Sequence, residues 1–410
     1  MPLCEVAQVQ LGRQRSPQHH TGPNMRPYLR AANVTWHGLE LSDVKVMNFS
    51  ETEMETFRLL PNDILVNEAS GSASEVGKPA IFHGEIDNCG FQNHLIRIRA
   101  FGADTGYLFY FLRWNALSGA YLSESQGVGI NHLGKTKLAA WSTPLPTLAE
   151  QQRIVEILEE QFSRLDAALA SIRRVREKAA MFRQSLLQAA FSGELSVDGT
   201  AAWEQLPLTS VAAIINGDRG KNYPSKSYRT TSGVPFINAG HLVANRIDMS
   251  DMDFISREHF NLLGNGKLAT SDLLFCLRGS LGKVALNTQL HEGAIASSLA
   301  IVRPNEHVLP PYLFYYFQSP FSAQMVKQFD NGTAQPNLAA GNLRKFIVPL
   351  PPLDEQGHLV GILDDQFSRL DAAGLIANQL EARIASEQRS LLHAAFSGTL
   401  TAQWRETHNG

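Results

Sequence analysis

Residues 144–195 read PLPTLAEQQRIVEILEEQFSRLDAALASIRRVREKAAMFRQSLLQAAFSGEL. Residues 349–400, which begin 205 positions later (349 − 144), read PLPPLDEQGHLVGILDDQFSRLDAAGLIANQLEARIASEQRSLLHAAFSGTL. The two stretches align without a gap, and 27 of the 52 positions are identical. Chance does not produce this identity, so the chain is a tandem duplication. The period is too long for a solenoid repeat and predicts two copies of a domain followed by a helix.

Each repeated stretch predicts a long helix with one apolar stripe. Apolar residues recur at alternating steps of three and four, which is a heptad pattern. The predicted seam consists of Val155, Leu158, Phe162, Leu165, Leu169 and Ile172 in the first copy and Val360, Leu363, Phe367, Leu370, Ala377 and Ile384 in the second. After Ile172 the pattern changes phase through Val175 and Phe182, and Leu380 extends the second seam.

The length of these helices favours pairing between them. No proline interrupts residues 150–190 or 355–395, so each helix of about 40 residues is roughly 60 Å long. A lone helix of this length with one apolar stripe needs a partner. We therefore predict an antiparallel intramolecular coiled coil in a pseudo-two-fold chain. The alternative is two separate amphipathic helices, each packed on its own domain.

Short signals mark the ends of these helices. Thr147 and Glu150 have the spacing of a capping box at the first start. Gly193 and Gly398 lie where a helix commonly ends in a left-handed residue.

The segments before the helices are weaker copies of each other. Tyr107–Leu112 aligns with Tyr312–Phe317, again 205 positions apart, whereas the polar loops differ. Short β-rich runs between turn residues predict α+β domains. The predicted organisation is a first domain at 1–146, a helix at 147–193, a linker at 194–203, a second domain at 204–350, a helix at 351–398 and a tail at 399–410.

Composition describes an ordinary globular protein without a broad basic field. Hydrophobic residues make up 44% and charged residues 18% of the 410 positions, and the net charge is −3. Residues 1–146 hold 12 basic and 13 acidic residues, and residues 204–350 hold 13 and 10, so any DNA contact must come from local loops. Three distant cysteines and the lack of a signal peptide predict a cytoplasmic location.

No set of catalytic residues is recognisable. Leu309-Pro310-Pro311-Tyr312 is similar to the Pro-Pro-Tyr motif of amino-methyltransferases, but Leu309 cannot accept the hydrogen bond that the motif requires. His83-Gly84-Glu85 has the spacing of a zinc deaminase without the accompanying cysteines. We therefore predict no catalysis and no metal in this chain.

Two variable α+β domains, each followed by Pro-Leu-Pro-x-Leu-x-Glu-Gln and a long helix ending in Ala-Ala-Phe-Ser-Gly, resemble the specificity subunit of a Type I restriction–modification enzyme. The resemblance covers essentially the whole chain. It implies two target recognition domains that each read one half of a bipartite double-stranded DNA site, with a coiled coil that sets their distance.

The resemblance also implies partners. Two adenine-methyltransferase subunits would bind this chain, and restriction subunits would join through them. S-adenosylmethionine, ATP and Mg²⁺ are expected in those partners, with no cofactor in this chain. The competing hypotheses are an enzyme with its own methyltransferase or nuclease chemistry, which the absent motifs disfavour, and a coiled-coil adaptor with protein-binding heads.

Base and phosphate contacts need polar and basic side chains on loops. The candidates are Arg13, Arg15, Arg30, Asn67, Ser70, Ser72 and Lys78 in the first domain and Arg219, Lys221, Asn222, Lys226, Arg229, Arg278, Ser280 and Lys283 in the second. Arg278 is favoured because the glycine beside it lets the backbone approach a phosphate.

Two further expectations concern the helix surfaces. Arg164 and Arg369 recur in Phe-Ser-Arg-Leu-Asp, and we expect ion pairs with Asp166 or Asp371 rather than DNA contacts. The outer faces of the helices are expected to be exposed without partner subunits. These faces carry Ile154, Ile157 and Leu187 in the first helix and Leu359, Ile362 and Leu392 in the second.

Overall fold

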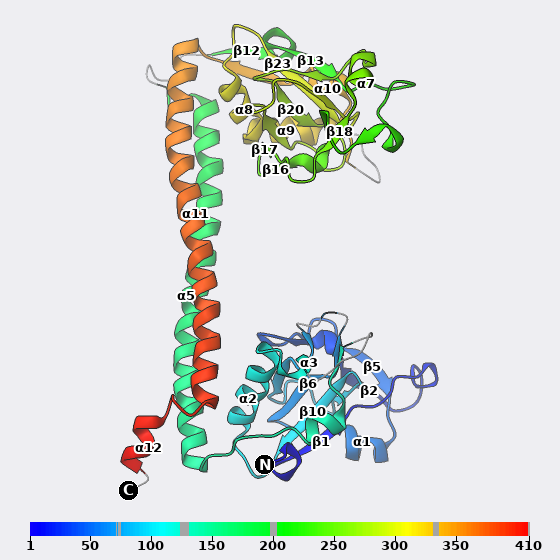
Figure 1. Cartoon of the computed structure of the whole chain (residues 1–410), viewed down its shortest axis with the longest axis vertical. Coiled ribbons are helices and arrows are strands. Elements are labelled where there is room, and N and C mark those ends of the chain that lie inside the picture. The colour runs from blue at the N-terminus through cyan, green and yellow to red at the C-terminus, as the bar shows by residue number, and fades with distance from the viewer. Residues whose placement is uncertain (71, 73–74, 124–130, 197–202, 331–335, 409–410) are drawn as a thin grey trace. The chain divides into compact units, whose positions relative to one another are not determined.

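The computed structural model describes residues 1–410 except 71, 73–74, 124–130, 197–202, 331–335 and 409–410 (Figure 1). Contacts divide the chain into two compact units. Unit 1 comprises Met1–Ile172 and Ala377–Gly410, and unit 2 comprises Arg173–Ile376. Each unit therefore contains one globular domain and part of both long helices. Most of the predicted linker, residues 197–202, lies outside the described residues.

The domain of unit 1 is built on two sheets. A four-stranded antiparallel sheet has the order β1-β10-β6-β8, and a three-stranded sheet has the order β5-β2-β9. The strands are β1 (Ala7–Leu11), β2 (Met25–Leu29), β3 (Val34–Thr35), β4 (Gly38–Leu39), β5 (Lys45–Asn48), β6 (Asp63–Asn67), β7 (Ala69–Ser70), β8 (Pro79–Phe82), β9 (Gly90–Phe91), β10 (Leu95–Ala100) and β11 (Asn131–His132). The helices are α1 (Glu51–Phe57), α2 (Thr105–Leu117), α3 (Ala120–Ser123) and α4 (Lys135–Ala139).

The domain of unit 2 repeats this plan. Its antiparallel sheet has the order β13-β23-β20-β21, and a five-stranded sheet has the order β14-β18-β15-β22-β19. The strands are β12 (Glu204–Pro207), β13 (Ala212–Asn216), β14 (Arg229–Thr230), β15 (Val234–Ile237), β16 (Leu242–Val243), β17 (Arg246–Ile247), β18 (Asp253–Ile255), β19 (Lys267–Leu268), β20 (Leu273–Cys276), β21 (Val284–Leu286), β22 (Gly293–Ile295), β23 (Leu299–Pro304) and β24 (Ile347–Leu350). The helices are α6 (Leu208–Val211), α7 (Arg257–Leu262), α8 (Pro310–Gln318), α9 (Pro320–Phe329) and α10 (Ala340–Leu343). The predicted pair of α+β domains is confirmed.

The same buried ion pair fastens the main sheet of each domain. Arg99 binds both carboxylate oxygens of Asp63 at 2.7 Å in unit 1. Arg303 binds both oxygens of Asp272 at 2.8 Å in unit 2. Both aspartates are almost fully buried, so each needs this bidentate partner to offset the loss of its hydration.

The repeated stretches form α5 (Leu148–Ser192) and α11 (Leu353–Phe396), which are antiparallel within each unit (Figure 1). In unit 1 the start of α5, at Ile154 and Leu158, shares a core cluster with Leu392 and Ala395 near the end of α11. In unit 2 the end of α5, at Leu187, shares a cluster with the start of α11. The predicted antiparallel helix pair is therefore present. A short helix, α12 (Ala402–His408), follows in unit 1.

Every predicted seam residue except Leu380 is buried or half-buried, but the predicted phase change after Ile172 is wrong. Val175 and Phe182 are exposed, and so is Leu380 in the second helix. The heptad spacing instead continues without a slip through the half-buried Arg176, Ala179 and Arg183 in α5 and through Glu381 in α11. A long side chain can occupy such a position because its aliphatic stem packs while its charged group reaches solvent.

The helix ends follow the local signals in part. Gly193 and Gly398 have φ of 85° and 82°, as predicted for left-handed ends. The backbone N–H of Glu150 donates to the Thr147 hydroxyl at 3.3 Å, but the predicted capping box is not completed. The carboxylate of Glu150 is buried and instead accepts hydrogen bonds from Thr401 and Arg405 of the segment after α11, at 2.7 and 2.9 Å.

The expectation of exposed outer faces is also wrong. Ile154, Leu187, Leu359 and Leu392 are each at most 2% exposed, because the globular domain of their unit packs against that face of the helix. Ile157 and Ile362 are half-buried. Each helix end thus has two covered faces, one toward the other helix and one toward a domain.

Phe162 and Phe367 test the packing of the long helices against the domains. Phe162 contacts Tyr110 of its domain with ring centroids 5.5 Å apart, and Phe367 contacts Tyr315 at 5.4 Å. We expect Phe162→Ala and Phe367→Ala each to lower the free energy of unfolding by about 3–5 kcal/mol, because a buried ring is replaced by a cavity. Thermal or denaturant unfolding unchanged by both substitutions would contradict the described packing.

Candidate nucleic-acid interface and helix surface

A buried glutamine joins each long helix to its domain. The Gln151 side chain donates to the Pro146 carbonyl at 2.9 Å and accepts from the Asp104 backbone N–H at 2.9 Å. Gln356 likewise donates to the Pro351 carbonyl at 2.9 Å and accepts from the Leu309 N–H at 2.8 Å. These contacts explain why the glutamine of Glu-Gln recurs in both copies. A hydrocarbon side chain would leave buried backbone groups unpaired, at about 1–3 kcal/mol for each group.

The far end of the other helix completes each attachment. Phe191, at the end of α5, lies 5.0 Å from the Tyr312 ring in unit 2. Phe396, at the end of α11, lies 5.4 Å from the Tyr107 ring in unit 1 and stacks on Trp114. The Ala-Ala-Phe-Ser-Gly motif is therefore an anchor onto the domain at which the other helix begins.

Three of the candidates in the first domain are buried. Arg13 bonds Glu53 and the Asn48 carbonyl at 2.8 and 2.5 Å, Asn67 is 3% exposed, and Lys78 pairs with Glu75. These side chains stabilise the domain and are poorly placed to reach DNA. Their position on predicted loops did not indicate this burial, and a DNA contact by any of the three stays a prediction.

Arg15, Arg30 and Ser72 lie nearer solvent. Arg15 is exposed and donates to His20 at 3.1 Å, and Arg30 pairs with Asp43 at 2.9 Å. Ser70 ends the short strand β7, and Ser72 is exposed. The four therefore stay predictions.

The first domain also contains a buried carboxylate that the sequence did not single out. Glu68 follows Asn67, and Nε2 of His132 lies 3.2 Å from its carboxylate. Burial raises the pKa of Glu68. Leu277 takes the equivalent place in the second domain, because the backbone N–H of Leu133 donates to Glu68 as that of Leu338 donates to Leu277.

The second domain has more basic candidates without an ion-pair partner than the first domain has. Among the predicted candidates, the exposed basic side chains that form no ion pair with a described residue are Arg219, Lys221, Lys226, Arg278 and Lys283. Ser280 is also exposed. In contrast, the Arg229 guanidinium pairs with Asp253 at 2.7 Å, and the Asn222 amide donates to the Leu262 carbonyl at 3.0 Å.

Arg278 lies beside a turn with a left-handed glycine. Gly279 has φ of 80°, and the backbone of Arg278 bridges to Asn337. Its side chain is exposed, whereas Leu277 before it is buried in the domain core. The backbone is thus held firmly while the guanidinium stays available to a ligand.

Sequence reasoning missed an exposed aromatic ring among these cations. Tyr228 is 51% exposed, and its ring lies 4.5 Å from that of His259. His259 is buried, and its Nε2 lies 3.0 Å from the Asn222 carbonyl oxygen. In the sequence, this ring was indicated only by a tyrosine that lies between two basic residues, Lys226 and Arg229.

The predicted partners of the repeated arginines are wrong. Arg164 pairs with Glu160 at 2.6 Å, and Arg369 pairs with Asp365 at 3.1 Å. Residues four apart face each other on a helix, whereas residues two apart do not. Asp371 instead pairs with Arg183 of α5, at 2.5 Å.

In unit 2, five large apolar side chains near the middle of the long helices are exposed to solvent. Val175, Met181, Phe182, Leu375 and Ile376 are each between 46 and 65% exposed. We call these five residues the central apolar surface. The nearby seam positions, Ala179 and Gly374, carry small side chains or none. Large apolar side chains on the outside of a helix pair commonly mark a protein interface.

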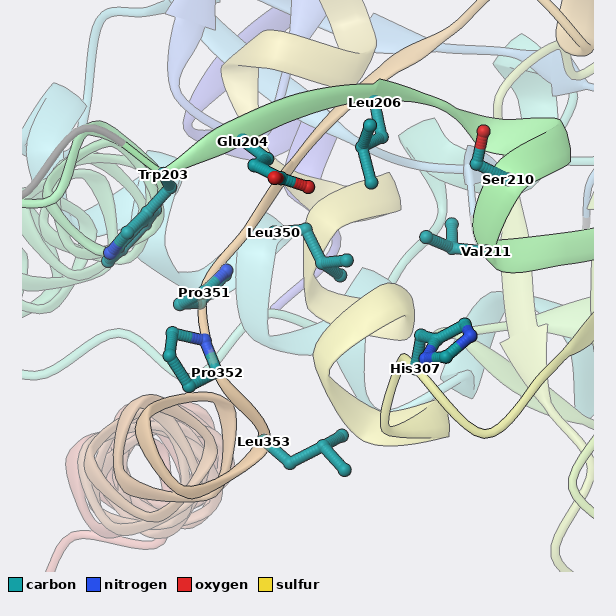
Figure 2. Close-up of a pocket in the computed structure, with 10 residues that line it drawn as sticks. All are labelled: Trp203, Glu204, Leu206, Ser210, Val211, His307, Leu350, Pro351, Pro352 and Leu353. Carbon is teal, nitrogen blue, oxygen red and sulfur yellow. The ribbon is translucent and has the colours of Figure 1, made fainter.

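A cavity of unit 2 lies where α11 begins, and Figure 2 shows the residues around it. Its volume is about 700 Å³. Trp203 and Leu206 come from the strand segment, Pro351 and Pro352 from the chain entering α11, and His307 from a loop on the opposite side. These walls bring together no set of catalytic side chains.

The described residues contain no group of three or more His, Cys, Asp or Glu side chains that could hold a metal ion. The Glu85 carboxylate accepts a hydrogen bond from the backbone N–H of His83. Burial raises the pKa of the Cys89 thiol to about 12, so it stays protonated at neutral pH.

In the described part of the chain, no helix has the length and apolar character needed to cross a membrane.

Comparison with known proteins gives a consistent result. The family model described as "Type I restriction modification DNA specificity domain" matches residues 1–173 and 201–382. The EcoKI specificity subunit of Escherichia coli is 27% identical across 92% of this chain and 83% of its own length. The MjaVIII specificity subunit of Methanocaldococcus jannaschii is 23% identical across 83% of this chain and 79% of its own length.

Two solved structures share the fold. A chain from a study of complex assembly and conformational transition of the type I R-M system has a TM-score of 0.77, with 18% identity and 97% of both chains covered. The HsdS subunit from Thermoanaerobacter tengcongensis has a TM-score of 0.54, with 19% identity over 97% of this chain and 96% of that one. With two matched domains that span most of its length, the chain belongs to the Type I restriction–modification DNA specificity family.

Proposed function

We propose that this chain is the DNA-recognition subunit of a Type I restriction–modification complex and has no catalysis of its own. Each globular domain reads one half of a bipartite asymmetric site. The paired helices set the spacing between the halves and dock the methyltransferase subunits, through which the restriction subunits join. Catalysis, with S-adenosylmethionine, ATP and Mg²⁺, belongs to those partners in the cytoplasm.

The duplicated architecture is the observation that carries this proposal. Both domains use the same sheet order and the same Asp–Arg pair, and both attach to the helices through the same buried glutamine. Their polar loops differ. A common scaffold with different loops supports two recognition surfaces with different sequence preferences.

Readout by the second domain is assigned to its exposed cations. Arg219, Lys221 and Lys226 lie on the segment that follows β13, and Arg278 and Lys283 flank the turn at Gly279. Arginine can bind guanine with two hydrogen bonds, whereas lysines commonly position the phosphate backbone. For the first domain we favour Arg15, Arg30, Ser70 and Ser72.

Docking of methyltransferase subunits is assigned to the central apolar surface. Its five residues are large and exposed, yet they belong to long helices whose ends are covered by the domains. At about 25 cal/mol for each Å² of apolar area removed from water, covering such side chains supplies a substantial driving force for association.

Methylation mapping tests the proposed function. The chain is combined with the methyltransferase subunit of the same system, and modified adenines are mapped on a random-sequence DNA library. Methylation at one bipartite sequence is expected only when both proteins are present. Methyl transfer by the rigorously purified chain alone would reject the non-catalytic role, and site-independent methylation by the complex would reject the recognition role.

Arg278→Ala tests the assignment within the second domain. If Arg278 binds a guanine through two hydrogen bonds, the substitution should weaken DNA binding by about 1–3 kcal/mol and relax the preference at one base pair. If it binds only a phosphate, affinity falls for all sequences and the salt dependence of binding drops by about one unit of slope. Binding measured across base substitutions and salt concentrations separates these outcomes. A changed preference in the half-site read by the first domain would contradict independent reading.

Deleting one heptad from each helix tests the spacing role. Residues 169–175 and 374–380 are equivalent in the two copies, and their removal keeps the heptad pattern. One heptad is about 10 Å of helix, or roughly three base pairs of DNA. We expect a shorter spacer between unchanged half-sites in a methylation map. Altered half-sites at an unchanged spacing would refute the spacing role.

A further inference from the structure

The two copies differ where the domain meets the long helices, in the corner formed by one aromatic ring and two carboxylates. In unit 2 an arginine, Arg183, lies against the ring and one of the carboxylates. There the Arg183 guanidinium lies 4.1 Å from the centre of the Phe367 ring and pairs with Asp371 at 2.5 Å. The hydroxyl of Tyr315 donates to Asp364. Arg183 is 28% exposed at its side chain, so most of the cation is covered. Both carboxylates and the aromatic face thus have partners within the chain.

Unit 1 has the same walls without the cation. Each wall residue lies 205 positions earlier: Tyr110, Glu159, Phe162 and Asp166 stand for Tyr315, Asp364, Phe367 and Asp371. The residue equivalent to Arg183 is Gln388 of α11. Glu159 and Asp166 form no hydrogen bond or ion pair with a described residue. The corner therefore keeps both carboxylates and the ring but lacks the arginine.

A cavity occupies this corner in unit 1. It has a volume of about 580 Å³, and its walls include Glu159, Phe162, Asp166 and Gln388 together with Trp36. Arg113 also lines the cavity and donates to the Trp36 carbonyl at 2.9 Å. Burial lowers its pKa and the nearby Asp166 acts against this, but Arg113 forms no ion pair with either carboxylate. Arg113 therefore does not replace the missing guanidinium.

We propose that this cavity receives an arginine side chain of one methyltransferase subunit, with its guanidinium stacked on Phe162 and paired with Asp166. The chain's own second copy supplies the template, since Arg183 makes these two contacts with Phe367 and Asp371. The proposal rests on the proposed function, in which methyltransferase subunits bind this chain.

The charge of the cavity selects a protein over DNA as the ligand. Its described walls hold three carboxylates, one arginine and two histidines: Glu85, Glu159, Asp166, Arg113, His37 and His83. A phosphate backbone is repelled by such a lining, whereas a planar cation fits both the aromatic faces and the carboxylates. The difference between the copies also makes the two methyltransferase subunits unequal. In unit 2 the equivalent residues Leu286, Thr288 and Phe314 line a smaller cavity of about 330 Å³, and Arg183 already occupies the face of Phe367.

Asp166→Asn tests the cavity with little change in shape. The methyltransferase subunit of the same system is titrated against the full chain bound to its DNA, and both binding steps are measured. We expect the affinity of one binding step to fall about tenfold or more, because the substitution removes a charge that accepts hydrogen bonds. The affinity of the other step should stay unchanged. Glu160→Gln is the matched control. It removes the same charge on the same helix, but Glu160 pairs with Arg164 and does not line the cavity.

Gln388→Arg supplies the missing cation from within the chain. We expect this variant to unfold at a higher temperature and to lose the same binding step, because its own guanidinium fills the cavity. Both variants binding two methyltransferase subunits with wild-type affinity would overturn the proposal while leaving the proposed function intact. A wild-type chain that binds no methyltransferase subunit would instead reject the proposed function, and this inference with it.

Discussion

Each globular domain is held by the beginning of one long helix and the end of the other. In unit 1 the buried Gln151 fastens the start of α5 to the domain, and Phe396 inserts the end of α11 among Tyr107 and Trp114. In unit 2, Gln356 and Phe191 have the same roles. Neither domain can be fully attached unless the two helices run antiparallel, so the motifs at both ends of the repeat serve one constraint.

This constraint frees the rest of each domain to vary. The attachments use backbone carbonyls and aromatic rings near the helices, and the Asp–Arg pairs use the main sheets. The loops with Arg219, Lys221 and Arg278 contribute little to either contact. Sequence preference in one domain can therefore change without altering how that domain is held or how the other domain reads its half-site.

Departures from the internal symmetry are as informative as the symmetry. Where the second copy stacks Arg183 on Phe367, the first has Gln388 and an open cavity. Where the second domain has a buried Leu277, the first has Glu68 beside His132. Each difference changes which charged groups the two units contain.

The sequence by itself determined the duplication, the two long helices, the left-handed ends at Gly193 and Gly398, and the family. These depend on local periodicity and on identity between copies, both of which a single chain carries. Only the tertiary structure decided that Arg183 keeps the heptad register while Phe182 faces solvent, and that Arg13 and Lys78 are buried. The physical reason is that burial depends on what lies opposite a side chain. An arginine facing an aromatic ring and a carboxylate packs inside, whereas a phenylalanine facing no covering surface remains exposed.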